Sequence, residues 1–458
     1  MRAAPALFPI AMLAAGWLAG CAGAPFAAET AARDRVNHVG AGLPGATKPG
    51  AARPALPVLT TESPSADFAR YAVLNHPGVI AAYYDWRAAV EAITPARALP
   101  DPKFTFEADI ADTLMTFMPG LMFDFMTPGK RAAMGREAAA TSDVARRTFV
   151  VTVLRTAAEV RKAWVELAYA AEIDRLYSSS VHAVNEAIAL ANADYATTRG
   201  MAGFDRQIRL QNAAAQHHAH HATVADRLVA ARARFKSALG LQPADVDPPW
   251  PQPALTVTPV PAADELWRRA AAANPELAKM RGMVDMAIAG IEVARNAGTP
   301  DFAAGAMVDF KASPLMVRPT ASLSLPIWRN KIAAGIAAAE ARRDAAAARV
   351  SAEQLNLAAE LAQMLFMVRE ADRMLAYIDG KALPNLERAL AFAEAGAQAG
   401  MAGPAMISET RIMAIDMRHE RVDLLRQREL AVVDLALLTA SVAPADMLPA
   451  ADLAAATP

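Results

Sequence analysis

The tetrapeptide Gly-Met-Ala-Gly occurs twice in this chain of 458 residues, in "ATTRGMAGFDRQ" at residues 196–207 and in "AQAGMAGPAMIS" at residues 397–408. The two copies begin at Gly200 and Gly400. Three prolines recur at nearly the same interval, since Pro77, Pro102 and Pro128 are each followed 198 residues later by Pro275, Pro300 and Pro326. The three prolines and the Gly-Met-Ala-Gly sequence thus recur together at nearly one interval, which predicts a tandem duplication of a unit of about 200 residues.

Within each unit the hydrophobic pattern changes in the same order. A helical stretch, which in the first unit covers residues 65–97 and breaks at Pro77, comes first. Apolar and polar residues then alternate, as in a strand with one apolar face. In the first unit this face contains Phe104, Phe106, Ala108, Ile110, Leu121, Phe123 and Phe125. In the second it contains Phe302, Ala304, Ala306, Val308, Phe310, Ala321, Leu323 and Leu325. The pattern predicts two strands per unit.

After each pair of strands the apolar residues step by threes and fours, as in a coiled-coil seam. The seam contains Val150, Val153, Ala157, Val160, Trp164, Leu167 and Ala171 in the first unit, and Leu357, Leu361, Met364, Val368, Ala371, Leu375 and Ile378 in the second. About 70 residues at 1.5 Å each predict a helix of roughly 100 Å. The glycine-containing turn then reverses the chain into returning helices over 205–238 and 405–438, because glycine accepts the positive φ of a helix end.

The N-terminal sequence "MRAAPALFPIAMLAAGWLAGC" at residues 1–21 has the short apolar core of a secretory signal. Small residues precede Cys21, the only cysteine of the chain, as in the lipobox of bacterial lipoproteins. We therefore expect a signal peptide over 1–20 and a lipid on Cys21. An ordinary signal peptide with an incidental cysteine is the alternative. With one cysteine no internal disulfide can form.

Composition sets the remaining boundaries. Residues 21–63 are rich in Ala, Pro and Gly without apolar periodicity, which predicts a flexible tether. The first unit then covers 64–246, with strands in 102–127 and its tip at 200–203. A Pro-rich linker covers 247–263. The second unit covers 264–440, with strands in 300–327 and its tip at 400–403, and a flexible tail covers 441–458.

Charge and motifs exclude several function classes. The 47 acidic and 46 basic residues nearly cancel, so net charge does not favour a nucleic acid partner. Gly129 and Lys130 lack the upstream glycine and the following Ser or Thr of a phosphate loop. Metalloprotease and serine-hydrolase motifs are also missing from the sequence. We expect no enzyme and no cofactor.

The expected fold class is mainly α with a small β part, in which tandem long helical hairpins accompany four transmembrane strands per chain. After the signal peptide, no stretch of the sequence is long and apolar enough for a membrane-spanning helix. Four strands cannot close a barrel alone, and open edges in lipid cost several kcal/mol per unsatisfied group. Three chains would supply twelve strands. Oligomerisation must therefore close the barrel.

The lipobox, the Pro-punctuated tandem units, the strand pairs with long coiled hairpins, and the glycine-containing tips resemble the TolC family of outer-membrane efflux factors over residues 65–440. The resemblance implies a homotrimer whose 12-stranded β-barrel lies in the outer-membrane lipid. It also implies that this homotrimer is the passive channel of a tripartite efflux system and extends into the periplasm. It also implies two partners, a periplasmic adaptor (membrane fusion) protein docked on the tips and an inner-membrane pump of the resistance-nodulation-division type.

The same resemblance implies roles for particular residues. The adaptor-docking residues would be those of the two tips, Gly200, Met201, Ala202 and Gly203 in the first unit and Gly400, Met401, Ala402 and Gly403 in the second. Asp205 and Glu409, just beyond the tips, are the candidate pore-constricting acids. A solvated helix face is the alternative for both acids.

The sequence "QHHAHHA" at residues 216–222 is the sharpest chemical signal. His217, His218 and His221 are candidate metal ligands, because spacings of three and four put imidazoles on one helix face. A polar stripe facing water or a neighbouring helix is the alternative. The histidines and 21 methionines favour heavy-metal ions such as copper as cargo. A different interpretation of the whole chain is a lipid-anchored periplasmic coiled-coil scaffold, or a metal-buffering protein, without a channel. That interpretation does not account for an apolar strand face.

Overall fold

The computed structural model describes residues 26–46, 56–110, 114–197, 201–310, 312, 314–399 and 404–442. These residues are mainly helical and include one four-stranded sheet, which confirms the fold class. The chain forms two compact units. Unit 1 takes in Met1–Ala41, Ala82–Thr148 and Lys279–Arg349, and unit 2 takes in Gly42–Ala81, Phe149–Ala278 and Val350–Pro458.

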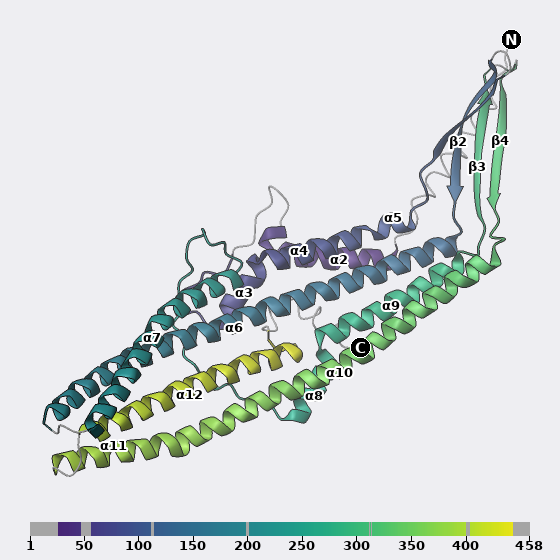
Figure 1. Ribbon diagram of the computed structural model, residues 1–458. Coiled ribbons are helices and arrows are strands. Elements are labelled where there is room, and N and C mark those ends of the chain that lie inside the picture. Colours follow the sequence, from purple (N-terminus) through teal and green to yellow (C-terminus); the bar gives the residue numbers. More distant parts are fainter. Residues whose placement is uncertain are drawn as a thin grey trace. The chain divides into compact units, whose positions relative to one another are not determined.

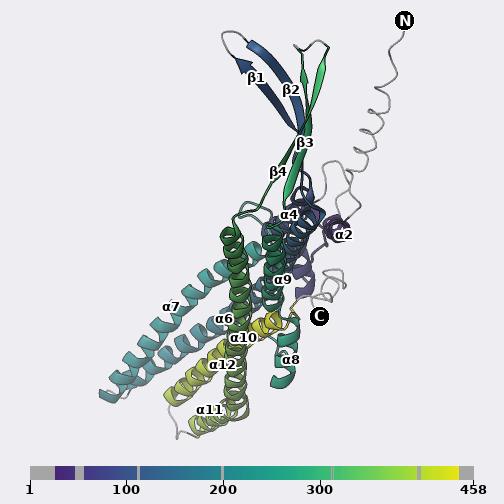
Figure 2. The same cartoon turned by 90° about the vertical axis from the view of Figure 1, so that its right-hand side faces the viewer.

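The sheet of unit 1 contains one strand pair from each repeat. Its strands are β1 (Lys103–Ile110), β2 (Leu114–Phe125), β3 (Asp301–Asp309) and β4 (Met316–Ser324). They are antiparallel in the order β1-β2-β3-β4, and Figure 2 shows them side by side with a pronounced twist. The two repeats join where β2 pairs with β3, with Phe125 opposite Phe302. Sequence periodicity predicted the strands but not this pairing.

Three long helices accompany the sheet in unit 1: the first part of α6 (Pro128–Thr197), α9 (Pro275–Asn296) and the first part of α10 (Arg329–Tyr377), all labelled in Figure 1. Arg136 of α6 pairs with Glu292 of α9 at 2.6 Å. Arg295 of α9 pairs with Glu340 of α10 at 3.3 Å. Shorter helices α4 (Pro77–Glu91), which begins in unit 2, and α5 (Ile93–Arg97) precede β1.

Part of the segment expected to be a flexible tether is an ordered helix, and that prediction was wrong there. α2 covers Ala27–Gly42 and buries Ala32, Val36 and Val39, while the η1 turn at Pro44–Ala46 follows in unit 2. The phenol of Tyr83 in α4 donates to the carbonyl of Val36 at 3.2 Å. The buried residues of α2 follow helical spacing. Alanine occupies so many positions in this segment, however, that no apolar periodicity could be recognised in the sequence.

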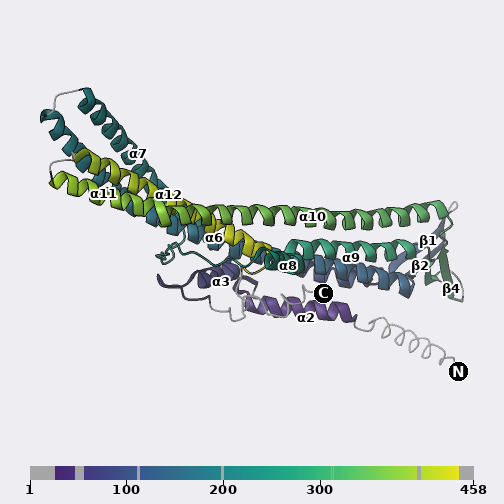
Figure 3. The ribbon, with the colours of Figure 1, turned by 90° about the horizontal axis from the view of Figure 1, so that it is seen from below.

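Unit 2 contains the coiled helical hairpins. α6 ends in it and is followed by the returning helix α7 (Met201–Ala238); α11 (Leu383–Gln398) is followed by α12 (Pro404–Leu438), and Figure 3 shows both pairs. α3 (Ser65–Asn75) and α8 (Ala263–Ala273) complete it. Most of the predicted seam residues are buried, and Leu361 and Val368 of α10 pack with Leu435 of α12. Tyr169 and Ile173 of α6 pack with other helices in a second cluster.

The long helix of the second repeat changes pitch near its end. α10, a π-helix over Ile378–Ala382 and α11 follow one another without a break, with 49, 5 and 16 residues, which together equal the 70 residues of α6. Pro384 lies at the start of α11 and has no N–H for the carbonyl of Gly380. A π-turn just before a proline is a common way to continue a helix through such a gap. The sequence pattern did not indicate this turn.

The break between the first two helices of each repeat is held by matching hydrogen bonds. The side-chain nitrogen of Asn75 donates to the carbonyl of Leu239 at 3.2 Å, and that of Asn274 donates to the carbonyl of Leu438 at 3.1 Å. Each bond ties the start of its repeat to the end of the returning helix. These equivalent contacts support the duplication inferred from the spacing of the prolines.

The two returning helices end in the same backbone turn. After α7, the amide of Leu241 donates to the carbonyl of Lys236 at 3.2 Å; after α12, the amide of Ser441 donates to that of Ala436 at 2.8 Å. These are the long bonds of a Schellman cap. The left-handed residue is Gly240 (φ 76°) in the first repeat but Ala440 (φ 54°) in the second.

Candidate functional site

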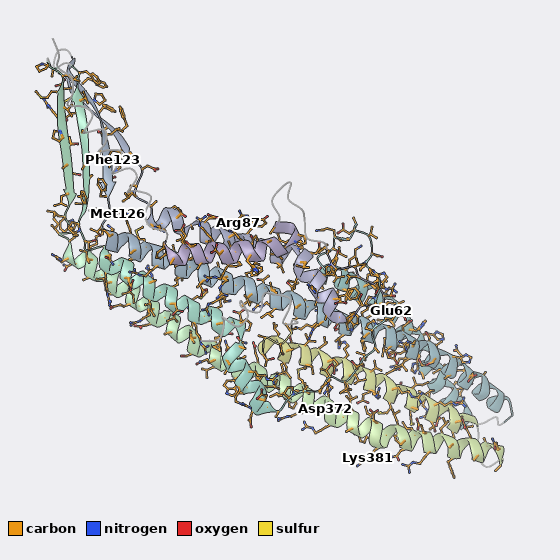
Figure 4. The ribbon with its side chains drawn as sticks, turned by 180° about the vertical axis from the view of Figure 1, so that it is seen from behind. Glu62, Arg87, Phe123, Met126, Asp372 and Lys381 are labelled. Carbon is orange, nitrogen blue, oxygen red and sulfur yellow. The ribbon has the colours of Figure 1, made fainter. Side chains whose placement is uncertain are left out.

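One face of the sheet is apolar and exposed. Phe104 and Phe106 of β1 are each 69% exposed, and Phe123 of β2 lies on the same face (Figure 4). Paired residues of antiparallel strands point to the same face. The register therefore places most of the predicted apolar residues together: Phe104 with Leu121, Phe302 with Phe125 and Leu323, and Ala304 with Ala321. The rings of Phe125 and Phe302 stack at 5.0 Å.

The opposite face is polar and less exposed. Lys103 pairs with Asp124 at 2.6 Å, and Arg318 lies 3.9 Å from the buried carboxylate of Asp309. Met118 on this face is also buried. An apolar exposed face with charges on the more enclosed face is the reverse of a soluble sheet. It is the arrangement of a sheet whose outer face meets lipid and whose inner face meets water.

The junction of the two repeats depends on a glycine that sequence reasoning missed. Gly305 of β3 lies opposite Met122 of β2, and a Cβ at Gly305 would lie 2.2 Å from the carbonyl oxygen of Leu121. No side chain fits there without moving the backbone. An isolated glycine within an alternating strand is the signal that could have indicated this close approach.

The predicted tips lie largely outside the described residues. In the first tip, Gly200 falls outside them, whereas Met201, Ala202 and Gly203 form the first turn of α7. The whole second tip falls outside them, that is Gly400, Met401, Ala402 and Gly403. Cys21 and the expected signal peptide also lie outside the described residues. The docking and lipidation assignments therefore remain predictions.

The two candidate pore acids lie near the starts of the returning helices. Asp205 in α7 is exposed and forms an ion pair with Arg209 on the next turn. Glu409 in α12 is exposed as well. Both positions keep a carboxylate in contact with water, as a pore-lining role requires. Their role in constriction remains a prediction.

The histidines of α7 have different surroundings. His218 lies 3.4 Å from the side-chain oxygen of Asn185, and His221 lies 3.2 Å from the hydroxyl of Ser178, both on α6. His217 is instead buried. Within the described ranges, no group of three or more His, Cys, Asp or Glu side chains is arranged to hold a metal ion. The metal assignment to His217, His218 and His221 therefore gains no support from the geometry.

His217 has a buried partner ring from the second repeat that the sequence did not indicate. Its ring lies 6.3 Å from that of His419 in α12, and Tyr177 of α6 packs against His419 at 4.1 Å. Burial lowers the pKa of both histidines, while the nearby carboxylate of Asp416 opposes this effect. His220 lowers the pKa of both histidines further, and His218 does the same for His217. Two imidazoles with lowered pKa values thus lie where three helices meet.

A search of the described helices finds none with a stretch long and apolar enough to span a bilayer.

Comparisons with known proteins agree with this architecture. Residues 266–441, most of the second repeat, match the family model "Outer membrane efflux protein". No curated protein matches the sequence.

Three solved channels have a similar fold. The open state of the MtrE outer membrane channel of Neisseria gonorrhoeae superposes with a TM-score of 0.69 at 17% identity, covering 83% of this chain and 89% of that one. VceC of Vibrio cholerae gives 0.65 at 16%, covering 82% and 95%. CusC gives 0.67 at 14%, covering 85% and 95%. The fold match extends over both repeats, and the sequence match covers the second. The chain is therefore similar in fold to outer-membrane efflux channels and, over residues 266–441, similar in sequence to the outer membrane efflux protein family.

Proposed function

We propose that this chain is the passive outer-membrane channel of a tripartite efflux system. The observation that carries the proposal is the exposed aromatic face of the four-stranded sheet, built by Phe104, Phe106 and Phe123. A periplasmic scaffold has no use for such a face in water, where large exposed apolar patches promote association. The match of residues 266–441 to the outer membrane efflux protein model and the fold shared with solved channels support the same function.

A homotrimer would close the sheet. Within the described chain, β1 and β4 each pair on one side only, so both edges present unpaired backbone groups. Such groups cost several kcal/mol each in hydrocarbon, so the edges must pair with other strands. Three chains would bring twelve strands, enough for a barrel with an aqueous lumen. The polar face with Lys103, Asp124 and Arg318 would then line the lumen.

The remaining assignments belong to the same proposal. The tips at Gly200–Gly203 and Gly400–Gly403 would dock a periplasmic adaptor protein that connects the channel to an inner-membrane pump. A lipid on Cys21 would add an anchor in the outer membrane. Heavy-metal ions such as copper are the proposed cargo, supported by the histidine and methionine content of the sequence.

Solute permeation in liposomes tests the channel proposal and the pore acids together. The purified protein is reconstituted, and the uptake of a small sugar is measured for wild type and for the Asp205→Asn, Glu409→Gln double variant. Like charges gathered at one constriction bind counter-ions and repel one another, so neutralising them should raise permeation. Glu420→Gln, an exposed acid on α12, is the matched control and should behave as wild type. Impermeable liposomes for every variant would contradict the channel.

A further inference from the structure

A cavity of about 440 Å³ lies within unit 2, and no residue of the sheet or of the tips lines it. Its walls come from α6, α8, α12 and the Pro-rich linker. Apolar side chains form much of the lining, among them Trp164, Leu266 and Val432. Its size falls in the range of small-molecule sites, roughly 300–1,000 Å³, which are typically apolar with a few placed polar groups.

The linker is fixed over the cavity by a buried ion pair. Arg428 and Glu429 of α12 are both buried and lie 2.5 Å apart. Glu429 accepts from the amide and the hydroxyl of Thr258, at 3.1 and 2.6 Å, and Arg428 donates to the carbonyl of Thr258 at 2.9 Å. Arg428 also donates to Asp372 of α10 at 2.6 Å. The cavity wall is therefore pre-formed rather than a loose loop.

One cation on this wall lacks a counter-charge. The Nε atom of Arg161 on α6 is buried without a hydrogen-bond partner, and among the described residues this guanidinium forms no ion pair. Burial lowers the pKa of Arg161, with no carboxylate near enough to offset the effect. Arginine stays charged in proteins, so this partly exposed guanidinium brings an unpaired positive charge to the cavity wall.

The other charged groups on the wall are already paired. Arg269 bonds Glu265 at 2.6 Å, and Glu429 is held by Arg428 and Thr258. The wall therefore carries one unmatched positive charge beside a large apolar surface. Ser65 supplies a hydroxyl at the same wall.

We propose that this cavity binds a small amphipathic monoanion, with a carboxylate on Arg161 and an apolar body against Trp164, Leu266 and Val432. The planar guanidinium matches a carboxylate in a bidentate arrangement, which is stronger than a neutral hydrogen bond. A single free cation favours one negative charge over two. The site is independent of the proposed channel function, since it uses neither the sheet nor the tips.

Isothermal titration calorimetry on the purified full-length protein in neutral detergent tests the proposal. The probe is 1-naphthoate, which has one carboxylate and an apolar body, and its uncharged counterpart 1-naphthamide is titrated in parallel. The variants are Arg161→Gln, Arg161→Lys and the matched control Arg269→Gln, which removes a guanidinium on the same wall that is already bonded to Glu265. Oligomer mass and melting temperature establish that each variant folds.

The proposal expects 1-naphthoate to bind at least tenfold more tightly than 1-naphthamide. Arg161→Gln should remove this preference, Arg161→Lys should retain part of it, and Arg269→Gln should change affinity less than threefold. Equal binding of both probes, or unchanged binding by folded Arg161→Gln, would overturn it. An absence of binding to folded wild type would also overturn it, and would point to a carboxylate of a neighbouring subunit as the partner of Arg161.

Discussion

Exchanging glycine and alanine between the two helix ends should change stability in opposite directions. Ala440 has φ 54° and Gly240 has φ 76°, and both occupy the left-handed position of a Schellman cap. An L-residue in this conformation costs roughly 1–2 kcal/mol, whereas glycine in its place loses about 0.4–1 kcal/mol through the entropy of the unfolded chain. Ala440→Gly should therefore stabilise the end of α12 by about 0.5–1 kcal/mol.

The reverse change, Gly240→Ala, should lower stability by more than the difference between these two conformational terms. A Cβ on Gly240 would lie 2.6 Å from the Cα of His76, so the backbone at the first helix break must move. Overpacking of this kind typically adds about 1–3 kcal/mol. We expect a loss of roughly 2–3 kcal/mol in total.

Hydrogen exchange followed by mass spectrometry reads both ends in one experiment, on peptides that cover the ends of α7 and α12. Because about 1.4 kcal/mol corresponds to a tenfold change, Ala440→Gly should slow exchange about two- to fivefold at the end of α12. Gly240→Ala should speed exchange at least tenfold at the end of α7. Faster exchange in Ala440→Gly, or no change in Gly240→Ala, would refute the reasoning from backbone conformation.

Three further results are expected. Phe106→Lys should reduce the amount of protein assembled in the outer membrane, because a lysine facing mid-bilayer lipid costs about 2–4 kcal/mol. Thr105→Lys, on the opposite face, should assemble normally. Membrane fractionation measures both amounts, and an equal loss in the two variants would contradict the assignment of faces. His217 and His419 have lowered folded pKa values, so the unfolded chain binds more protons below pH 6.5, and stability should fall as pH drops, by at most about 1.4 kcal/mol per unit for each histidine. Denaturant midpoints measured between pH 7 and 5 should show this dependence of stability on pH. The double variant His217→Gln, His419→Gln should show a weaker dependence. An unchanged dependence in the variant would contradict the role of the two histidines. Asn274→Ala removes a hydrogen bond to α12 and the cap of α9. The variant should lower the free energy of unfolding by about 1–3 kcal/mol in the same denaturant assay. An unchanged free energy of unfolding would show that this asparagine does not hold the helix break.

The sequence predicted the elements whose apolar residues recur at a regular spacing. It did not predict contacts between residues that are far apart in the chain. Alternation from Phe104 to Ile110 predicted β1, and steps of three and four predicted the seam of α10, because both patterns record one buried or lipid-facing side. The pairing of β2 with β3 depends on a register between distant repeats, and only the two glycines of that pairing, Gly120 and Gly305, marked it. α2 was missed because alanine is equally compatible with a packed helix and an irregular tether.

Side-chain partners were the least predictable part of the site. His217 lies close in sequence to His218 and His221, yet its ring faces His419 from the other repeat. Spacing along one helix defines a face but not what covers it. The unmatched charge of Arg161 was equally invisible, because its absence of a partner is a property of the packed helices and linker.

Three copies of this chain are proposed to form a conducting pore, and this can be measured directly. Full-length protein purified from outer membranes is placed in a planar lipid bilayer, and single-channel current is recorded alongside particle mass by light scattering. We expect particles with the mass of three chains that give discrete conducting steps. Monomers or dimers that never conduct would contradict it.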